Sequence, residues 1–449
     1  MTESMTSGSP IKLILKFSVP LLLGNLLQQM YNMIDAAIVG RMLGADALAG
    51  VGATSSIQFL VLGFCIGICA GFSIPVAKYF GAEQFDRLRS CIYHAYLMSG
   101  AIAVILTVST ALLCHRILDI MSTPADIYSN AYIYLFIIFL GIPFMIFYNL
   151  LAGIMRAVGD SRTPFIFLMI STFLNIFLDV MFIAVIKLGC AGAALATVIA
   201  QAVSGIACFV YIQKKYPLLK MSRSHCKFNG YALRELIIMG IPMGLQYSIT
   251  AIGSMVMQAA NNSLGSVYVS GFTAATKLKQ LAMCPFDAIA TGVSVFSGQN
   301  LGAGKTERIK KGIFSGVAVG AAYGAVIGLV LIFFGGKLSL MFVKSSETAV
   351  LAASAKYLVC VGFFYWILGI LNTTRMTIQG LGFSAVAIFS GVIEMVARIV
   401  VSRVFVPKYH FLAICFTDQS AWITAAIYCS IVCAVCVKRV SKKAMEKNT

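Results

Sequence analysis

The sequence predicts an all-α integral membrane protein in which about twelve transmembrane helices form two similar six-helix halves. Composition is the first of three observations that support this fold class, since 59% of the 449 residues are hydrophobic and only 11% are charged. A soluble domain carries roughly 25% charged residues, so this chain has too few to cover a water-facing surface. The other two observations are recurrent long apolar runs and an internal repeat.

The apolar runs are mostly about 20 residues or longer, which is enough to cross a hydrocarbon core roughly 30 Å thick. In chain order the expected spans are 13–39, 49–77, 91–113, 131–154, 164–186, 190–212, 235–261, 269–297, 312–335, 355–378, 384–406 and 412–437. The first run is too long for the apolar part of a cleavable signal peptide, so it is interpreted as a span. An even number of spans places both termini on the same side of the membrane.

The basic residues indicate which side that is. The net charge of +18 comes mainly from Lys and Arg between the spans, so it indicates membrane topology and no nucleic-acid partner. Loops on the side of the termini, with Arg375 counted among them, carry roughly three times as many Lys and Arg as the other loops. We therefore expect a multi-pass protein of the inner or plasma membrane with both termini in the cytoplasm.

Three pairs of segments repeat at nearly constant spacing. Phe17-Ser-Val-Pro20 resembles Met239-Gly-Ile-Pro242, Tyr79-Phe-Gly81-Ala resembles Asn300-Leu-Gly302-Ala, and the stretch 149–161 resembles 372–384, at offsets of 222, 221 and 223 residues. The expected organisation is an N-lobe at 1–212, a basic cytoplasmic linker at 213–234, and a C-lobe with a basic tail at 235–449. Transporters commonly use such repeats, with the substrate site between the halves.

Ionisable groups inside spans are costly and indicate function. Asp35 ends a polar stripe on the first span, which at 100° per residue is confined to one face (Asn25, Gln28, Gln29, Asn32 and Asp35). Asn175 and Asp179 are four residues apart and share a face of the fifth span. Two carboxylates with amide and hydroxyl oxygens suit either a proton or Na⁺. The alternative is a satisfied polar cluster that joins two helices.

The second half contains three further candidates for a polar site, Asp287, Glu394 and Arg398. Glu394 and Arg398 are four residues apart on one helix, so a neutralising ion pair is the simplest interpretation. Asp287 follows Lys279 by two turns, and the two are compatible with a second functional site or with an internal pair.

Signatures of other chemistry are missing from the sequence. There is no phosphate-binding loop of the Walker type and no His-Glu-x-x-His zinc motif, so we expect no enzyme, no catalytic residue and no cofactor beyond a coupling ion. The 13 Cys are scattered, mostly within apolar segments, which does not indicate a disulfide framework.

Three motifs resemble those of the multidrug and toxic compound extrusion (MATE) transporters. They are Gln28-Gln-Met-Tyr-Asn32-Met-Ile-Asp35 with Val39-Gly40 after it, Gln299-Asn-Leu-Gly-Ala-Gly304, and Arg156-x-x-Gly159-Asp-Ser-x-Thr-Pro164 followed by Asn175. The resemblance extends over essentially the whole chain. It implies two six-helix lobes around a central cavity, alternating access, and export of cationic or amphipathic molecules by H⁺ or Na⁺ antiport.

The resemblance also implies roles for single residues. The positions that match the family's ion-coupling site are Asp35, Tyr134, Asn175, Asp179 and Thr197, with Na⁺ at Asp35 and Asp179 as the one metal to consider. Gln28 and Asn149 match drug contacts, and Asn32 lies on the same stripe as Gln28. Some family members carry an acidic residue on the seventh helix, but the stretch 246–254 of this chain contains none.

Rival interpretations remain at the level of sequence. A flippase for lipid-linked precursors, of the same broad superfamily, is favoured by Lys277 and Lys279, because such a protein is expected to have a cationic cavity. A membrane-embedded enzyme or receptor is the remote alternative. The expected partners are a small organic substrate and the lipid bilayer, and the expected assembly is a monomer.

Overall fold

The computed structural model describes residues 4–121, 123–221 and 225–448, and this described part of the chain is helical without strands. Within it, eleven helices are long and apolar enough to cross a membrane. A bent pair, α5 (Ala125–Leu140) and α6 (Ile142–Ala157), supplies the twelfth span with an angle of 48° between its parts. The bend lies at Gly141, where a Cβ atom would come 2.3 Å from a methyl group of Val198. The predicted all-helical membrane fold is confirmed.

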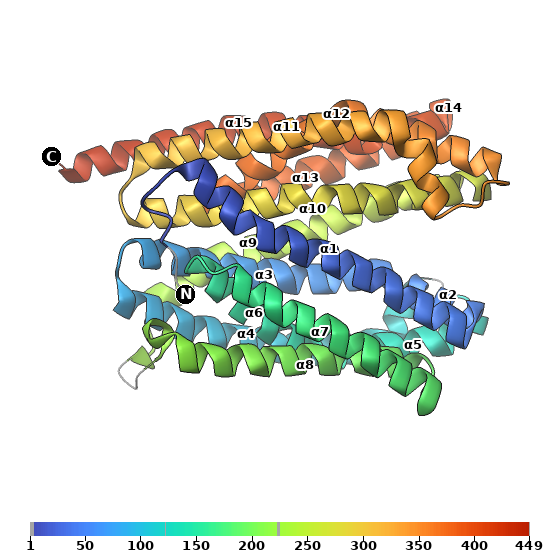
Figure 1. Ribbon diagram of the computed structural model, residues 1–449, viewed down its shortest axis with the longest axis horizontal. Coiled ribbons are helices and arrows are strands. Elements are labelled where there is room, and N and C mark those ends of the chain that lie inside the picture. The colour runs from blue at the N-terminus through green and yellow to red at the C-terminus, as the bar shows by residue number, and fades with distance from the viewer. Residues whose placement is uncertain (1–3, 122, 222–224, 449) are drawn as a thin grey trace. The chain divides into compact units, whose positions relative to one another are not determined.

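Figure 1 shows the order of the helices along the chain. Those of the first repeat are α1 (Pro10–Leu43), α2 (Ala45–Ala53), α3 (Ser55–Gly81), α4 (Phe85–Ile120), α5, α6, α7 (Arg162–Val180) and α8 (Cys190–Lys215). Those of the second are α9 (Gly230–Asn262), α10 (Ser266–Gly302), α11 (Thr306–Leu338), α12 (Thr348–Gly380), α13 (Ser384–Val400), α14 (Val406–Tyr409) and α15 (Phe411–Asn448).

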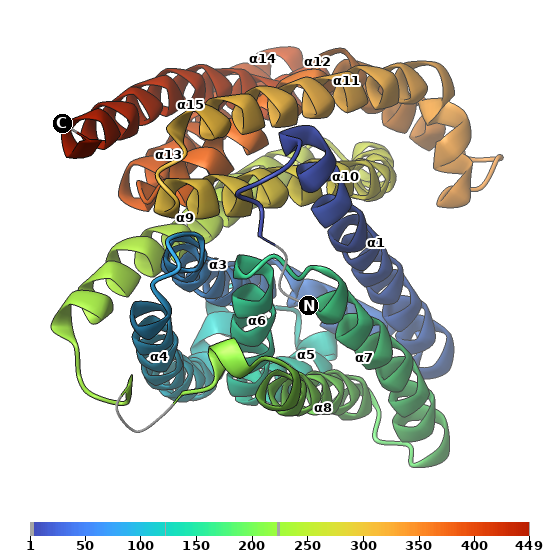
Figure 2. The ribbon, with the colours of Figure 1, turned by 60° about the vertical axis from the view of Figure 1, so that its left-hand side comes forward.

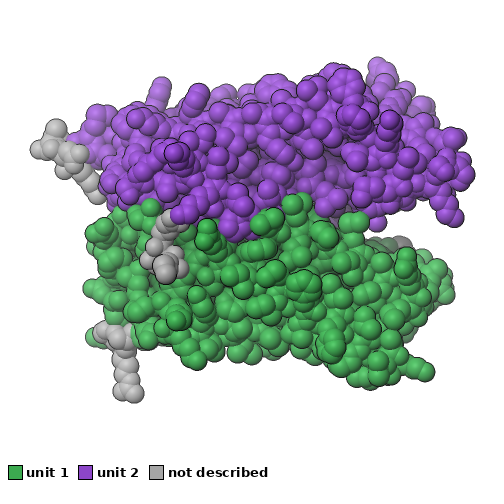
Figure 3. All heavy atoms as spheres, in the orientation of Figure 1, with its two compact units in different colours: residues 1–4, 23–244 green, residues 5–22, 245–449 purple. Residues whose placement is uncertain are grey.

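The chain forms two compact units, coloured separately in Figure 3. Unit 1 contains residues 1–4 and 23–244, and unit 2 contains residues 5–22 and 245–449. Both boundaries fall inside the first helix of a repeat, shortly after Pro20 in α1 and Pro242 in α9. Each of these two helices therefore begins in one unit and continues in the other. The lobe boundaries expected from the sequence stay a prediction.

Unit 2 has its tightest helix pair in α11 and α12, which lie side by side in Figures 1 and 2. Glycines at every fourth residue of α11, from Gly312 to Gly328, form one face of that helix. A Cβ atom on Gly324 would lie 2.5 Å from the Cα atom of Trp366, and one on Gly328 would lie 2.3 Å from the carbonyl oxygen of Gly362. Small residues allow such close approach between helices in a membrane, where no hydrophobic driving force joins them.

A π-helical turn follows both α7 and α13, at residues 181–185 and 401–405. The two turns occupy equivalent positions of the repeat. Turns of this kind often occur at functional sites, and Asp179 lies two residues before the first of them.

One residue used in the topology argument lies inside a helix. Arg375 was counted with the loops on the side of the termini, although the expected span 355–378 contains it. It lies within α12, and its guanidinium contacts Glu394, a carboxylate on another helix that compensates the charge and is not visible in local hydropathy.

Candidate functional site

Two carboxyl groups of unit 1 meet in its interior. Asp35, on the second part of α1, is 9% exposed, and Asp179, in the last turn of α7, is 0% exposed. Their carboxyl groups lie within hydrogen-bonding range of each other. Among the described residues, no hydrogen-bond donor reaches Oδ1 of Asp35 or either carboxylate oxygen of Asp179. Two ionised carboxylates in this position repel each other, and a shared proton or a bound cation removes that repulsion.

Hydroxyl and amide groups from two more helices complete this site. The hydroxyl of Tyr31, one turn before Asp35, hydrogen-bonds to the hydroxyl of Thr197 on α8 at 3.0 Å. The same Thr197 oxygen accepts a hydrogen bond of 3.3 Å from Nδ2 of Asn175. Tyr134 of α5 is buried within electrostatic range of both carboxyl groups. The structure thus brings together all five residues of the expected ion-coupling site, on helices α1, α5, α7 and α8.

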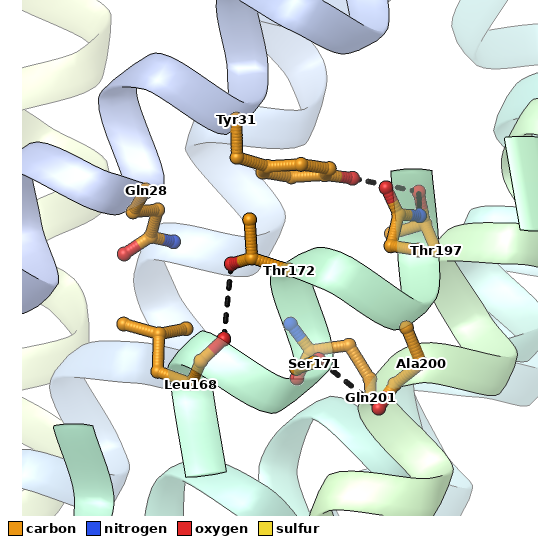
Figure 4. A pocket seen from close by; sticks show the side chains of 9 residues that line it. Gln28, Tyr31, Leu168, Ser171, Thr172, Thr197, Ala200 and Gln201 are labelled. Carbon is orange, nitrogen blue, oxygen red and sulfur yellow. Dashed lines mark hydrogen bonds between the residues drawn. The ribbon is translucent and has the colours of Figure 1, made fainter. Parts of the chain in front are cut away.

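A small, partly open cavity of about 30 Å³ adjoins the site and is lined by residues of α1, α7 and α8 (Figure 4). Its lining residues are Gln28, Tyr31, Leu168, Ser171, Thr172, Asn175, Thr197, Ala200 and Gln201. By that measure it holds roughly two water molecules. Among the described residues, Oδ1 of Asn175 and Oε1 of Gln201 are buried acceptor oxygens without a hydrogen-bond donor.

The residues expected to contact substrate have different surroundings. Gln28 lines the cavity, and its side chain and that of Asn32 are exposed on α1. Polar side chains exposed near the middle of a span are expected to face water rather than lipid. Asn149 donates a 2.9 Å hydrogen bond from Nδ2 to the carbonyl of Met145 in its own helix, and within the described part of the chain no contact joins it to the carboxyl pair.

Unit 2 contains five buried or nearly buried charged residues in a continuous chain, which we call the charge cluster. Lys279 donates to Oδ2 of Asp418 at 2.5 Å, and Nε of Arg398 donates to Oδ1 of the same carboxylate at 3.1 Å. Arg398 also pairs with Glu394 at 3.3 Å, and Arg375 pairs with the other oxygen of Glu394. The expected pair of Glu394 and Arg398 is present. Lys279, by contrast, takes Asp418 of α15 as its partner and not Asp287.

Asp287 itself has an exposed side chain on α10, although both of its neighbours in sequence are buried. Its Oδ1 accepts a 3.1 Å hydrogen bond from Asn372 of α12. An exposed carboxylate in the middle of a long, mostly buried span is expected to face water, because contact with lipid is costly. The charge cluster contains three cations and two anions and so carries a net charge of +1. The carboxylate of Asp287 on α10 would balance that charge.

Tyr31 and Asp418 contribute to these clusters but were not among the candidates from the sequence. Tyr31 is four residues before Asp35 and so shares its helix face, which was the available signal. Asp418 is an ionisable residue inside the last span and meets the same criterion as the other intramembrane carboxylates.

Comparisons with known proteins agree with this architecture. The profile of the MatE family matches residues 20–181 and 242–404, one stretch in each repeat. The "Probable multidrug resistance protein YpnP" of Bacillus subtilis is 30% identical over 366 residues, which cover 81% of this chain and 81% of YpnP. A second Bacillus subtilis protein, the "Probable multidrug resistance protein YoeA", is 29% identical over 359 residues, with 78% of each chain covered.

Solved structures have the same fold. The crystal structure of MATE in complex with MaL6 matches with a TM-score of 0.90 over 98% of both chains, at 19% sequence identity. At this identity the match establishes the arrangement of the helices and nothing about ligands.

Proposed function

The chain belongs to the MATE family of multidrug and toxic compound extrusion transporters, and on that premise we propose that it exports cationic or amphipathic small molecules by antiport with H⁺ or Na⁺. The name of its relative YpnP, a probable multidrug resistance protein, supports a substrate class of this kind. As a multi-pass protein of a family of transporters, the chain is not an enzyme.

The observation that carries the proposal is the contact between Asp35 and Asp179. Three of their four carboxylate oxygens are buried without a donor among the described residues. At an effective dielectric of about 20, two unit charges 4 Å apart interact by about 4 kcal/mol. Neutralising one carboxylate with H⁺, or bridging both with Na⁺, therefore changes the local free energy by enough to shift a conformational equilibrium.

The proposed cycle couples this site to movement of α1. In the outward-facing state the carboxyl pair takes up the ion, the repulsion disappears, and α1 repacks. Pro20 offers a place for α1 to bend, because proline has no N–H to donate to the preceding turn. The substrate is displaced outward, and the emptied carrier returns and releases the ion into the cytoplasm. Antiport requires only that ion and substrate prefer different states by a few kcal/mol.

The substrate contacts that we propose are polar groups exposed on the helices. In unit 1, Gln28 and Asn32 on α1 are exposed near the carboxyl pair. Taken by itself, unit 2 offers the exposed carboxylate of Asp287 on α10 as a contact for a cationic substrate. We also propose a monomer in the plasma membrane with both termini in the cytoplasm, which follows from the distribution of basic residues.

The flippase alternative rested on Lys277 and Lys279. Because Lys279 is paired with Asp418, its charge is neutralised locally and does not favour an anionic lipid-linked substrate. Lys277 is exposed, with its Nζ 5.6 Å from the ring centroid of Phe342, so only one of the two lysines still supports a cationic cavity. No second function is proposed.

The test is efflux of ethidium from proteoliposomes with an imposed pH gradient in one arm and a Na⁺ gradient in the other. We expect wild-type protein to respond to at least one gradient, which identifies the ion. Asp35→Asn should lose the gradient-driven part of the efflux. The matched control is Asp46→Asn, because Asp46 is an exposed carboxylate in the first turn of α2. Full gradient-driven efflux by Asp35→Asn would contradict the proposed coupling.

A further inference from the structure

The motif Gln299-Asn-Leu-Gly-Ala-Gly304 lies at the end of α10 and makes no contribution to the carboxyl pair or to the charge cluster. Gln299 and Asn300 are both 0% exposed. A buried amide needs hydrogen-bond partners, and these two find theirs in the short segment that precedes α1. We call residues 299–308, which end α10 and begin α11, the α10–α11 corner, and residues 5–8 the lead-in segment.

The α10–α11 corner binds the lead-in segment through its backbone. The N–H of Met5 donates to Oε1 of Gln299 at 2.8 Å, and Nδ2 of Asn300 donates to the carbonyl of Met5 at 3.1 Å. Both backbone polar groups of Met5, which is 3% exposed, are thus satisfied by one motif. These contacts therefore depend on the backbone conformation of the segment and not on the identity of its side chains.

Two basic residues of the corner bind further carbonyl groups of the segment. Arg308 donates from Nη1 to the carbonyl of Gly8 at 2.8 Å and from Nη2 to that of Met5 at 3.2 Å. Lys305 donates to the carbonyl of Thr6 at 2.9 Å. Nε of Arg308 also donates to Oδ1 of Asn300 at 3.0 Å, which orients the Asn300 amide toward Met5. Hydrogen bonds from charged donors are the stronger kind.

The other repeat does the same at the equivalent corner. Lys78 and Tyr79 precede Gln299 and Asn300 by 221 residues, the offset of the repeat. Within unit 1, Nζ of Lys78 lies 2.8 Å from Oε1 of Glu235, in the second turn of α9, and the Tyr79 hydroxyl donates to Oε2 at 2.5 Å. The corner of unit 2 therefore binds the segment before α1, and the corner of unit 1 binds the beginning of α9. Each of these two helices then continues into the other unit.

Small residues complete both attachments. In unit 1 a Cβ atom on Gly71 of α3 would lie 2.6 Å from the Cα atom of Gly240 in α9. In unit 2, at the equivalent place, a Cβ atom on Gly292 of α10 would lie 2.7 Å from Oγ of Ser18 in α1, which itself donates to the carbonyl of Ala288. The first parts of α1 and α9 are thus packed closely as well as hydrogen-bonded.

We propose that the α10–α11 corner is a permanent docking site for the lead-in segment, which keeps the beginning of α1 attached to unit 2 throughout transport. Detachment would break five hydrogen bonds to the segment and expose Gln299, Asn300 and Met5. Bending α1 near Pro20, where the boundary between the units falls, breaks none of them. If one unit moves against the other, α1 therefore bends after the docked segment, near Pro20, and the segment itself stays in place. The claim that the segment stays attached throughout transport rests on the proposed function. The claim that the corner binds the segment does not.

The decisive experiment is to join segment and corner covalently. Thr6→Cys and Lys305→Cys replace a contacting pair near the surface, in a background where the exposed Cys226 is changed to Ser. A flexible bifunctional thiol reagent then links the two, and a monofunctional reagent on the same protein is the control. We expect linked protein in proteoliposomes to export ethidium at the rate of the control. Loss of export on linking would overturn the proposal, because it would mean that the segment must detach.

The docking itself is tested without transport by hydrogen–deuterium exchange of residues 4–9 in detergent. Asn300→Ala removes the amide that holds Met5, and we expect exchange in the segment to accelerate about tenfold. Asn262→Ala, at an exposed amide elsewhere in unit 2, should leave it unchanged. If Asn300→Ala does not fold, Arg308→Lys keeps the charge and loses the forked contact, with the same expectation. Unchanged exchange would refute the docking, and absence of ethidium export by wild-type protein would refute only the proposed function.

Discussion

Asp418 is the residue on which the charge cluster of unit 2 depends most. Its carboxylate accepts from Lys279 at 2.5 Å, from the Tyr357 hydroxyl at 2.8 Å and from Arg398 at 3.1 Å, while being 2% exposed. Replacing Asp418 with Asn leaves Lys279 without a carboxylate partner and Arg398 with Glu394 alone, and the NH₂ group of the new amide can only repel one of these cations. Breaking a buried ion pair by removing one partner typically costs about 3–5 kcal/mol. We expect a loss of folding free energy within that range.

Tryptophan fluorescence measures this loss directly. The chain has two Trp residues, Trp366 and Trp422, and both belong to unit 2. Trp422 packs against the ring of Tyr365 with a centroid distance of 5.8 Å, close to the cluster on α12 and α15. Denaturant unfolding in detergent, followed by this fluorescence, therefore reports on the unit that carries the substitution. Glu347→Gln is the control, because Glu347 is an exposed carboxylate of the same unit, and its expected effect is below about 0.5 kcal/mol.

A double variant distinguishes the effect of the unpaired charge from a general defect of packing. Adding Lys279→Met to Asp418→Asn removes the cation that has lost its carboxylate partner and replaces it with an apolar chain of similar length. We expect the double variant to be more stable than Asp418→Asn alone by at least about 1 kcal/mol, since neighbouring substitutions in one network are not additive. Equal stability of Asp418→Asn and Glu347→Gln, or no recovery in the double variant, would refute the reasoning.

Three further predictions concern packing, pH and substrate. Gly324→Ala should lower the thermal unfolding temperature in detergent well below that of Gly336→Ala, because the added Cβ would lie 2.5 Å from the backbone of Trp366 in the first case and 3.4 Å from Ala355 in the second. Burial and the hydrogen bond to Asp160 raise the pKa of Tyr216, so Tyr216→Phe should cost about 1 kcal/mol at neutral pH. That difference, measured by denaturant titration, should shrink above pH about 10, where unfolded tyrosine ionises and the stability due to the raised pKa is lost. Asp287→Asn should weaken export of ethidium about tenfold or more while leaving export of an uncharged dye unchanged, as measured by the concentration dependence of efflux.

Several features of the fold could be predicted because they depend on short stretches of sequence. The spans follow from the length of apolar runs, and the repeat follows from three matches at nearly one offset. The ion pair of Glu394 and Arg398 could be predicted because residues four apart on a helix are neighbours. The bent span at Gly141 could not, because the bend reflects a close approach to Val198, a residue of another helix.

The candidate site divides in the same way. Helical periodicity placed Asp35 on a polar stripe and Asn175 beside Asp179, but the meeting of Asp35 with Asp179 depends on how α1 packs against α7. The partners of Lys279 and Arg375 depend likewise on contacts between different helices. The local sequence pattern identified the residues that need a partner inside the membrane. It did not identify the partner of each residue.

By itself the sequence determined that this chain lies in a membrane, that its halves are related, and that its first half contains an unusual pair of intramembrane carboxylates. Only the tertiary structure decided that these two carboxyl groups meet, that Asp418 neutralises Lys279, and that α1 and α9 each change units shortly after a proline. The physical reason is the range of the interactions. Hydropathy and helical period act over at most a few turns of one helix, whereas charge compensation and close packing are decided by which helices become neighbours in space.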